Sequence, residues 1–129
     1  VIDSNDAITV QNLDGNIIAW NKGAEQMYGW REVEALQMNI RQLVPKSKIK
    51  ELEEFTQKLK NGESVNSLET QRQCKNGQTL NVWLTMTALK DDSGKPSEIA
   101  TTERDISELK QLRKISAEIL TTPVGHTGL

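Results

Sequence analysis

The stretch Asp14–Trp30, which reads DGNIIAWNKGAEQMYGW, decides the fold that we predict for this chain. Asp14-Gly15 predicts a two-residue hairpin loop, because glycine readily adopts the positive φ that such loops need. Asn16–Trp20 then predicts a short strand. Asn21 is a typical helix N-cap, since its side-chain oxygen can accept one of the backbone N–H groups left unpaired at the start of a helix. Gly29 predicts the end of that helix. A turn, a strand, a cap and a short helix therefore follow one another.

The residues on either side of this stretch predict further short elements. Ala7–Leu13 mixes β-branched and polar residues, which predicts a first strand that pairs with Asn16–Trp20. A longer helix is predicted over Lys46–Lys60, where apolar residues recur at steps of three, three and four and leave the charged residues on the solvent side. Its apolar residues are Ile49, Leu52, Phe55 and Leu59. The short helical segments predicted before it are Lys22–Tyr28, Arg31–Ala35 and Asn39–Leu43.

Three more strands are predicted after the long helix. They are Ser67–Cys74, Thr79–Leu89 and Ser97–Arg104. Thr79–Leu89 alternates most clearly, so that Trp83 lies on a polar face and the opposite face is apolar. The apolar face consists of Leu80, Val82, Leu84, Met86 and Ala88. The fold class that we predict is α+β, with a five-stranded antiparallel sheet flanked by short helices and one longer helix.

A C-terminal helix is predicted directly after the last strand. Asp105 and Glu108 have the spacing of an N-terminal capping pair. Apolar residues follow at spacings of three and four, namely Ile106, Leu109, Leu112, Ile115 and Ile119. They predict either a coiled-coil seam or a helix that packs back on its own sheet, and both interpretations stay open. We therefore expect a domain over residues 1–105, a helix over 106–120, and a linker or the start of a further domain over 121–129.

Length, charge and cysteine content narrow the function classes. The 129 residues suffice for one domain with one hydrophobic core. The net charge of −2 argues against a nucleic-acid-binding protein, and no run of about 18 apolar residues predicts a membrane span. The single cysteine, Cys74, excludes an internal disulfide and favours a reducing compartment, so we expect a cytoplasmic protein. Because the chain begins at Val1 without a signal peptide, we expect it to be a piece of a longer protein.

The sequence contains no motif that would bring catalytic residues together. The one histidine, His126, has no carboxylate or cysteine near it in sequence. Metal-ligand spacings of the CxxC or HExxH type and glycine-rich phosphate loops do not occur. We therefore expect this domain to be neither an enzyme nor a metal-binding protein.

Five motifs, in this order, cover roughly residues 5 to 110 and resemble a PAS sensory domain of bacterial or archaeal signal-transduction proteins. The first is Asp14–Trp30, and the others are Gly62-Glu63, Lys75-Asn76-Gly77, Asp91-Asp92-Ser93-Gly94 and Arg104-Asp105-Ile106-Ser107. Ser107 replaces the threonine that is usual in the family. The resemblance implies a sensory module of a multidomain signalling protein, such as a two-component system. In such a module the signal leaves through Asp105, Ile106, Glu108 and the helix that follows them, often across a parallel homodimer.

The resemblance also implies where a ligand would lie and which cofactors to test. Haem-binding relatives have an axial histidine on the long helix, and Lys46–Lys60 has none. Flavin-binding light sensors have a cysteine in the preceding short helix, and Met38–Gln42 has none. Neither chemistry is expected, whereas flavin bound non-covalently, or haem held by another ligand, stays open. The residues expected to line a ligand cavity, or else to fill the core, are Met38, Ile40, Leu43, Leu52, Phe55, Leu84, Met86 and Thr101.

Two further features concern partners. Trp83, on the polar face of its strand, predicts contact with the C-terminal helix or a second subunit. The alternative function is therefore a ligand-free protein–protein interaction and dimerisation domain. Ser116–Pro123 is loosely similar to the phosphoacceptor segment of sensor histidine kinases, with Ala117 at the histidine position, and also to the junction between PAS and STAS domains. The first similarity implies a histidine kinase as the effector in the same chain, and the second implies a STAS-like domain.

Overall fold

The first hairpin forms as a pair of antiparallel strands in the computed structural model, which describes residues 5–121. β1 (Ala7–Asn12) pairs with β2 (Ile17–Trp20). The predicted two-residue loop is wrong, because residues 13–16 all lie between the strands. The Asn12 side chain accepts hydrogen bonds from the N–H groups of Asp14 and Asn16, which stabilises this longer turn. Gly15 adopts the expected positive φ, 91°.

The helix after this hairpin begins and ends where the sequence predicts. α1 (Lys22–Tyr28) has Asn21 as its N-cap, and the Asn21 Oδ1 atom accepts a 2.8 Å hydrogen bond from the N–H of Ala24. Gly29 follows the helix with φ 82°, in the left-handed region that glycine adopts without steric cost. Both ends are therefore fixed by residues next to the helix in sequence.

Asn21 also connects α1 to β1. Its Oδ1 atom accepts a second hydrogen bond, of 2.9 Å, from the N–H of Ile8, and its Nδ2 atom donates to the carbonyl of Asp6 at 3.0 Å. Gly23 lets the two backbones approach closely, since a Cβ at this position would lie 2.1 Å from the Asp6 carbonyl oxygen. The cap residue and this glycine together hold α1 against the first strand.

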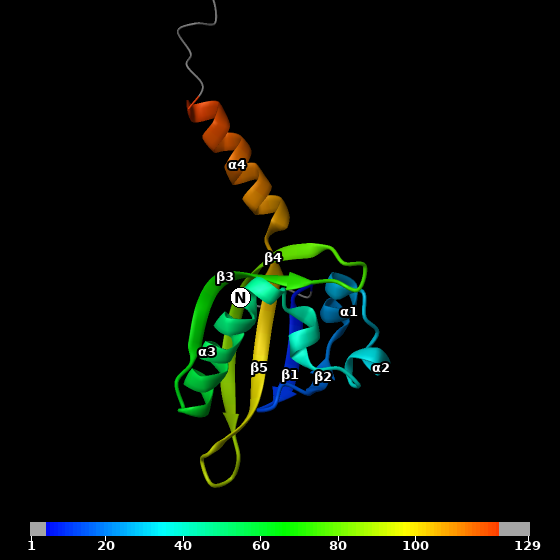
Figure 1. The fold of residues 1–129 in the computed structure, drawn as a ribbon, viewed down its shortest axis with the longest axis vertical. Coiled ribbons are helices and arrows are strands. Elements are labelled where there is room, and N and C mark those ends of the chain that lie inside the picture. Colours follow the sequence, from blue (N-terminus) through cyan, green and yellow to red (C-terminus); the bar gives the residue numbers. More distant parts are fainter. Residues whose placement is uncertain (1–4, 122–129) are drawn as a thin grey trace, which may run out of the picture.

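Three longer strands complete the sheet, as Figure 1 shows. β3 (Val65–Gln73), β4 (Thr79–Lys90) and β5 (Pro96–Asp105) are all antiparallel to their neighbours, in the order β2-β1-β5-β4-β3. This confirms the predicted α+β fold with a five-stranded antiparallel sheet. The last strand in the chain lies in the middle, where it joins the N-terminal hairpin to the β3–β4 hairpin. The apolar face predicted for β4 is turned to the core.

Several short helices and the longer α3 cover one face of this sheet, which we call the inner face (Figure 1). They are α1, α2 (Glu32–Ala35), η1 (Ile40–Leu43), η2 (Lys46–Lys48) and α3 (Ile49–Lys60). The prediction of a single helix from Lys46 is wrong at its start. Pro45 accepts a hydrogen bond from the N–H of Lys48 three residues later, which makes the first turn a 3₁₀ turn, and α3 begins only after it.

The C-terminal helix is confirmed within one residue of its predicted bounds. α4 (Ser107–Thr121) follows β5 directly and extends away from the end of the sheet (Figure 1). Among the helices of residues 5–121, none has the length and apolar character that crossing a bilayer requires. Residues 122–129, with His126 and most of the predicted linker, lie outside the described residues.

Candidate functional site

The predicted pocket residues lie together between the inner face of the sheet and the helices that cover it. Phe55 is partly buried against the core. The other seven are buried, namely Met38, Ile40, Leu43, Leu52, Leu84, Met86 and Thr101. The fold thus brings the eight candidates to one region, and their role as lining of a ligand cavity stays a prediction.

Polar residues on the inner face form a second group, which the sequence analysis missed except for Thr101. They come in pairs two residues apart on three strands, so each pair points to the same side as its apolar neighbours. The group consists of Thr9 and Gln11 on β1, Thr70 and Arg72 on β3, and Thr101 and Glu103 on β5, all of them buried. These residues could have been predicted from the period of two along each strand, because they lie two or four residues from apolar side chains that face the core.

Arg72, Glu103 and Tyr28 form the most polar part of this inner face, and we call them the Glu103 cluster. The Tyr28 hydroxyl on α1 donates a 2.8 Å hydrogen bond to Glu103 Oε1, and Arg72 Nε lies 3.4 Å from Glu103 Oε2. Each of the three residues is at most 2% exposed. Arg72 Nη1 also donates to the carbonyl of Gln71 at 2.7 Å. The cluster therefore joins α1, β3 and β5 inside the domain.

Burial controls the protonation of this cluster. It raises the pKa of Glu103, because the ionised carboxylate loses its hydration, and the nearby Arg72 guanidinium opposes this shift. Burial and the neighbouring Glu103 also raise the pKa of Tyr28 well above its usual value. Tyr28 therefore remains a protonated hydrogen-bond donor at any physiological pH.

Two neighbouring polar groups differ in how well they are paired. The hydroxyls of Thr9 and Thr101 are hydrogen-bonded to each other at 2.6 Å. In contrast, the buried amide oxygen of Gln11 has no hydrogen-bond partner among the described residues. A buried acceptor of this kind carries a desolvation cost of about 1 to 3 kcal/mol. Donors and acceptors on an otherwise apolar wall are the features that orient a small organic molecule.

Cys74, just after β3, does not have the environment of a reactive thiol. Its Sγ atom lies 3.4 Å from the carbonyl of Met27, to which it donates a weak hydrogen bond. Partial burial, and to a smaller extent Asp105, raise the pKa of the Cys74 thiol, which disfavours the nucleophilic thiolate. The thiol is therefore better described as a packing group than as a reactive one.

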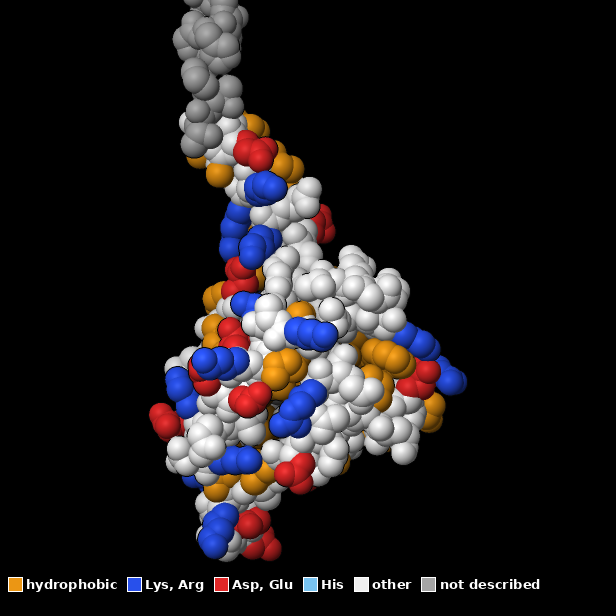
Figure 2. Space-filling view, viewed as in Figure 1, with side chains coloured by type: hydrophobic (Ala, Val, Ile, Leu, Met, Phe, Trp, Pro, Cys, Tyr) orange, Lys and Arg blue, Asp and Glu red, His pale blue; other side chains and the backbone are white. Residues whose placement is uncertain are grey.

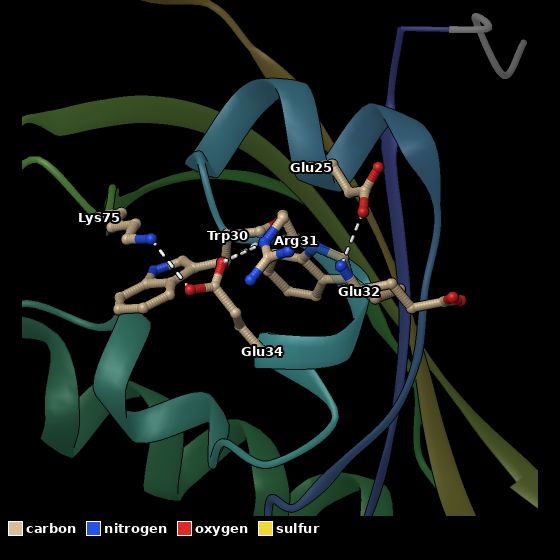
Figure 3. A network of polar contacts seen from close by, with 7 residues as sticks. Glu25, Trp30, Arg31, Glu32, Glu34 and Lys75 are labelled. Atoms are coloured by element: carbon tan, nitrogen blue, oxygen red, sulfur yellow. Dashed lines mark hydrogen bonds and ion pairs between the residues drawn. The ribbon is translucent and has the colours of Figure 1, made fainter.

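A network of polar contacts fixes the segment between α1 and α2, as Figure 3 shows. Lys75, in the β3–β4 turn, points to Glu34 with 2.9 Å between Nζ and Oε2, and its Nζ lies 5.1 Å from the centre of the Trp30 ring. Glu34 also accepts a hydrogen bond from the Arg31 N–H, and this bond, followed by Lys75, lowers the pKa of Glu34. This segment is thereby tied to the turn beyond β3, at the side of the domain where Tyr28 enters the core.

The first turn of α4 is hydrogen-bonded to the sheet. Asp105 Oδ1 accepts a 2.9 Å hydrogen bond from the N–H of Ser107. Asp105 lies one residue before the N-cap position, because α4 begins at Ser107 and the Ile106 carbonyl accepts the first helical bond, from the N–H of Lys110. Ile106 is buried, and its N–H donates to the Asn81 carbonyl on β4 at 2.9 Å. The Ser107 hydroxyl accepts a hydrogen bond from the N–H of Asn81 at 3.1 Å, so the serine at this position still supplies a hydroxyl, as a threonine would. These contacts fix the point where α4 leaves the domain.

Beyond that point, α4 exposes a row of apolar side chains, which we call the apolar stripe. It consists of Leu109 (47% exposed), Leu112 (54%), Ile115 (44%) and Ile119 (66%). Figure 2 shows hydrophobic side chains on the surface of α4, away from the body of the domain. Trp83, on the outer face of β4, is also 44% exposed, between Glu69 and Arg104 on the neighbouring strands. Both features are apolar surfaces of the kind that mark binding sites for other proteins.

Sequence comparison places this arrangement in a family. A family model described as a PAS domain matches residues 5–108. The chain belongs to the PAS domain family. No curated protein sequence matches it. PAS domains are generally sensory modules rather than catalysts.

Solved structures of PAS domains share the fold. The PAS domain of a protein from Colwellia psychrerythraea is 24% identical with a TM-score of 0.75, and the match covers 81% of this chain and 88% of that one. A domain of a sensory box sensor histidine kinase/response regulator from Geobacter sulfurreducens is 21% identical with a TM-score of 0.64, over 81% and 86% of the two chains. A PAS domain from a two-component sensor histidine kinase is 16% identical with a TM-score of 0.65, over 80% and 86%. At these identities the likeness shows the fold alone.

Proposed function

We propose that this PAS domain is the sensory and regulatory module of a larger signalling protein and passes its signal to a downstream domain through α4. The apolar stripe is the observation that carries the proposal. Four apolar side chains on one helix remain 44 to 66% exposed although the helix begins at a buried, hydrogen-bonded turn. Burying such area against a partner is favourable by about 25 cal/mol per Å². A helix that served only to end the domain would have no need of this stripe.

A second copy of the chain is the proposed partner of the stripe, in a parallel homodimer that continues into the effector. Two of the structurally similar domains come from sensor histidine kinases, which supports a linked effector in the same chain. A histidine kinase and a STAS-like domain are the two proposed effectors. The location proposed for such a protein is the cytoplasm.

A small molecule between the inner sheet face and α3 is the proposed input. The eight pocket candidates supply apolar walls, and the polar residues of the inner face supply donors and acceptors. The unpaired Gln11 oxygen would gain a partner from a ligand that carries a donor. Such a ligand shifts the equilibrium between two states of α4 only by its difference in affinity for them.

Sedimentation velocity of the 129-residue chain tests the proposed dimer. We expect the wild type to sediment as a dimer and Leu112→Gln as a monomer, because the substitution places an amide in the middle of the stripe. Lys114→Gln is the matched control, since Lys114 lies on the opposite side of the helix and should leave the dimer intact. A monomeric wild type, or equal effects of both substitutions, would contradict the proposal.

Output and ligand are tested separately. In the full-length protein, Asp105→Ala removes the acceptor for the Ser107 N–H, at a cost of about 1 kcal/mol to the helix start, and should uncouple the input from the output. A normal response in this variant would count against transmission through α4.

Mass spectrometry of material released from the denatured native protein identifies a bound ligand, and absorbance above about 350 nm would indicate a flavin or haem.

The second candidate function is a ligand-free interaction domain that binds a partner through the outer sheet face. The 44% exposure of the Trp83 side chain favours it, because tryptophan is enriched in protein interfaces. In that case no small molecule would be released on denaturation, and Trp83→Ser, rather than Leu112→Gln, would abolish association.

A further inference from the structure

Strand β3 contacts both α3 and α4, through neighbouring residues on opposite faces. Thr70 is 2% exposed on the inner face, whereas Glu69 lies on the outer face opposite Trp83 of β4. Successive residues of a strand point to opposite sides, so two adjacent side chains can contact elements on opposite faces of the sheet.

The inner contact is made with α3. The Thr70 hydroxyl donates a hydrogen bond to Glu51 Oε1, in the first turn of α3. Thr70 is buried and Glu51 half-buried, so this bond is largely shielded from water. It is a direct side-chain link between the strand and the helix that covers the proposed ligand region.

The outer contact is made with α4. Glu69 Oε2 lies 2.6 Å from Lys110 Nζ, and Glu69 Oε1 lies 3.8 Å from Arg113 Nη1. The Lys110 ammonium is the main cause of the lowered pKa of Glu69, so the carboxylate stays charged at neutral pH. Lys110 Nζ also lies 3.4 Å from the Asn81 side-chain oxygen on β4. A small hollow at this place is lined by residues of β3, β4 and α4 together with Lys48, just before α3.

These ion pairs also determine the direction of the apolar stripe. Lys110 and Arg113 are three residues apart and so share one side of α4, while Leu112, Ile115 and Ile119 lie on the opposite side. With the cationic side held at Glu69, the part of the stripe formed by Leu112, Ile115 and Ile119 points away from β3, whereas Leu109, four residues before Arg113, lies nearer the cationic side. A change in the position of Glu69 would rotate or release the stripe.

We propose that β3 couples α3 to α4, with Thr70 reporting the position of α3 and Glu69 setting the position and rotation of α4. This inference rests on the proposed function, because a coupling strand is useful only if α4 is the output. When a ligand or partner shifts α3, the Glu51–Thr70 hydrogen bond moves or breaks. The backbone of β3 then shifts at Glu69, and the contact with Lys110 and Arg113 changes. Glu69 and Thr70 are positioning residues in this scheme.

Hydrogen exchange of the α4 backbone amides tests the coupling, at a concentration at which the chain is monomeric. Glu69→Gln removes the charge that binds Lys110, so we expect the amides of residues 110–115 to exchange about two- to five-fold faster. Thr70→Val keeps the shape of the side chain and removes the hydroxyl. We expect it to accelerate the same amides although the lost hydrogen bond is made with α3 and not with α4. Glu51→Met removes the acceptor oxygen from the α3 side while keeping a side chain of similar length, and serves if Thr70→Val does not fold.

The double variant Glu69→Gln/Thr70→Val separates coupling from general loosening. If β3 transmits the change, the Thr70→Val effect on α4 disappears when Glu69 is already replaced, so the two effects do not add. Ser67→Ala, also on β3, is the matched control, since the Ser67 hydroxyl is hydrogen-bonded to Thr85 of β4 and not to α3 or α4, and it should leave α4 unchanged. Additive effects, unchanged exchange in both Thr70→Val and Glu51→Met, or an equal effect of Ser67→Ala would overturn the inference. Because exchange is read in the monomer without an effector, this result is independent of the dimer and output tests.

Discussion

Replacing Asn21 by alanine tests how the first helix is held to the sheet. The Asn21 side chain takes part in three hydrogen bonds. Its oxygen accepts from the N–H groups of Ala24 and Ile8 at 2.8 and 2.9 Å, and its nitrogen donates to the Asp6 carbonyl at 3.0 Å. Alanine removes all three without a change in backbone conformation, so the loss reports the hydrogen bonds.

The expected loss follows from these contacts. The cap to Ala24 is worth about 1 kcal/mol. The bonds to Ile8 and Asp6 are part-buried and contribute about 0.5 to 1.5 kcal/mol each, because their backbone groups would otherwise be left with poor access to water. The free energy of unfolding should therefore fall by about 2 to 4 kcal/mol, a large share of the roughly 5 to 15 kcal/mol that holds a domain folded.

Urea denaturation followed by tryptophan fluorescence measures this loss. With an m-value of about 2 kcal/mol per M, the midpoint of Asn21→Ala should fall by about 1 to 2 M. Asn21→Ser can restore the cap but does not reach β1, so it should recover only about 1 kcal/mol. Asn61→Ala, at an exposed position after α3, is the matched control and should change stability by less than about 0.5 kcal/mol. If Asn21→Ser were as stable as the wild type, the link to β1 would contribute nothing and the reasoning would be refuted.

Two further predictions concern the close approach at Gly23 and the ionisation of Glu103. Alanine normally stabilises a helix by about 1 kcal/mol over glycine, but at Gly23 its Cβ would lie 2.1 Å from the Asp6 carbonyl oxygen. We therefore expect Gly23→Ala to lower the free energy of unfolding by more than about 2 kcal/mol in the same assay. Unchanged stability would contradict the close packing. Because burial raises the pKa of Glu103 above 4.5 in the folded chain, the proton it holds stabilises the fold fully below pH 4.5, and this contribution is lost as the pH rises through the folded-state pKa. Glu103→Gln removes this dependence, so the stability of the wild type relative to the variant should fall in urea titrations as the pH rises above 4.5. A constant difference would show that burial does not perturb Glu103.

The sequence by itself determined the elements whose causes are local. α1 begins after Asn21 and ends at Gly29 as predicted, because a cap and a left-handed glycine act on backbone groups a few residues away. The apolar face of β4 was predicted because alternation along a strand depends only on its period of two. The family followed from short motifs in order, each of which forms a turn, a cap or a strand end.

Only the tertiary structure decided which polar groups meet. Tyr28, Arg72 and Glu103 lie far apart in the sequence and form a buried cluster because α1, β3 and β5 converge on one side of the sheet. Likewise, Glu69 binds Lys110 because the start of α4 is held at Asn81 of β4, the strand next to β3, an arrangement that no local signal encodes. Contacts of this kind depend on strand order and on the shape of the whole core. For that reason the sequence predicts how each segment folds, while the three-dimensional arrangement decides which side chains are brought together.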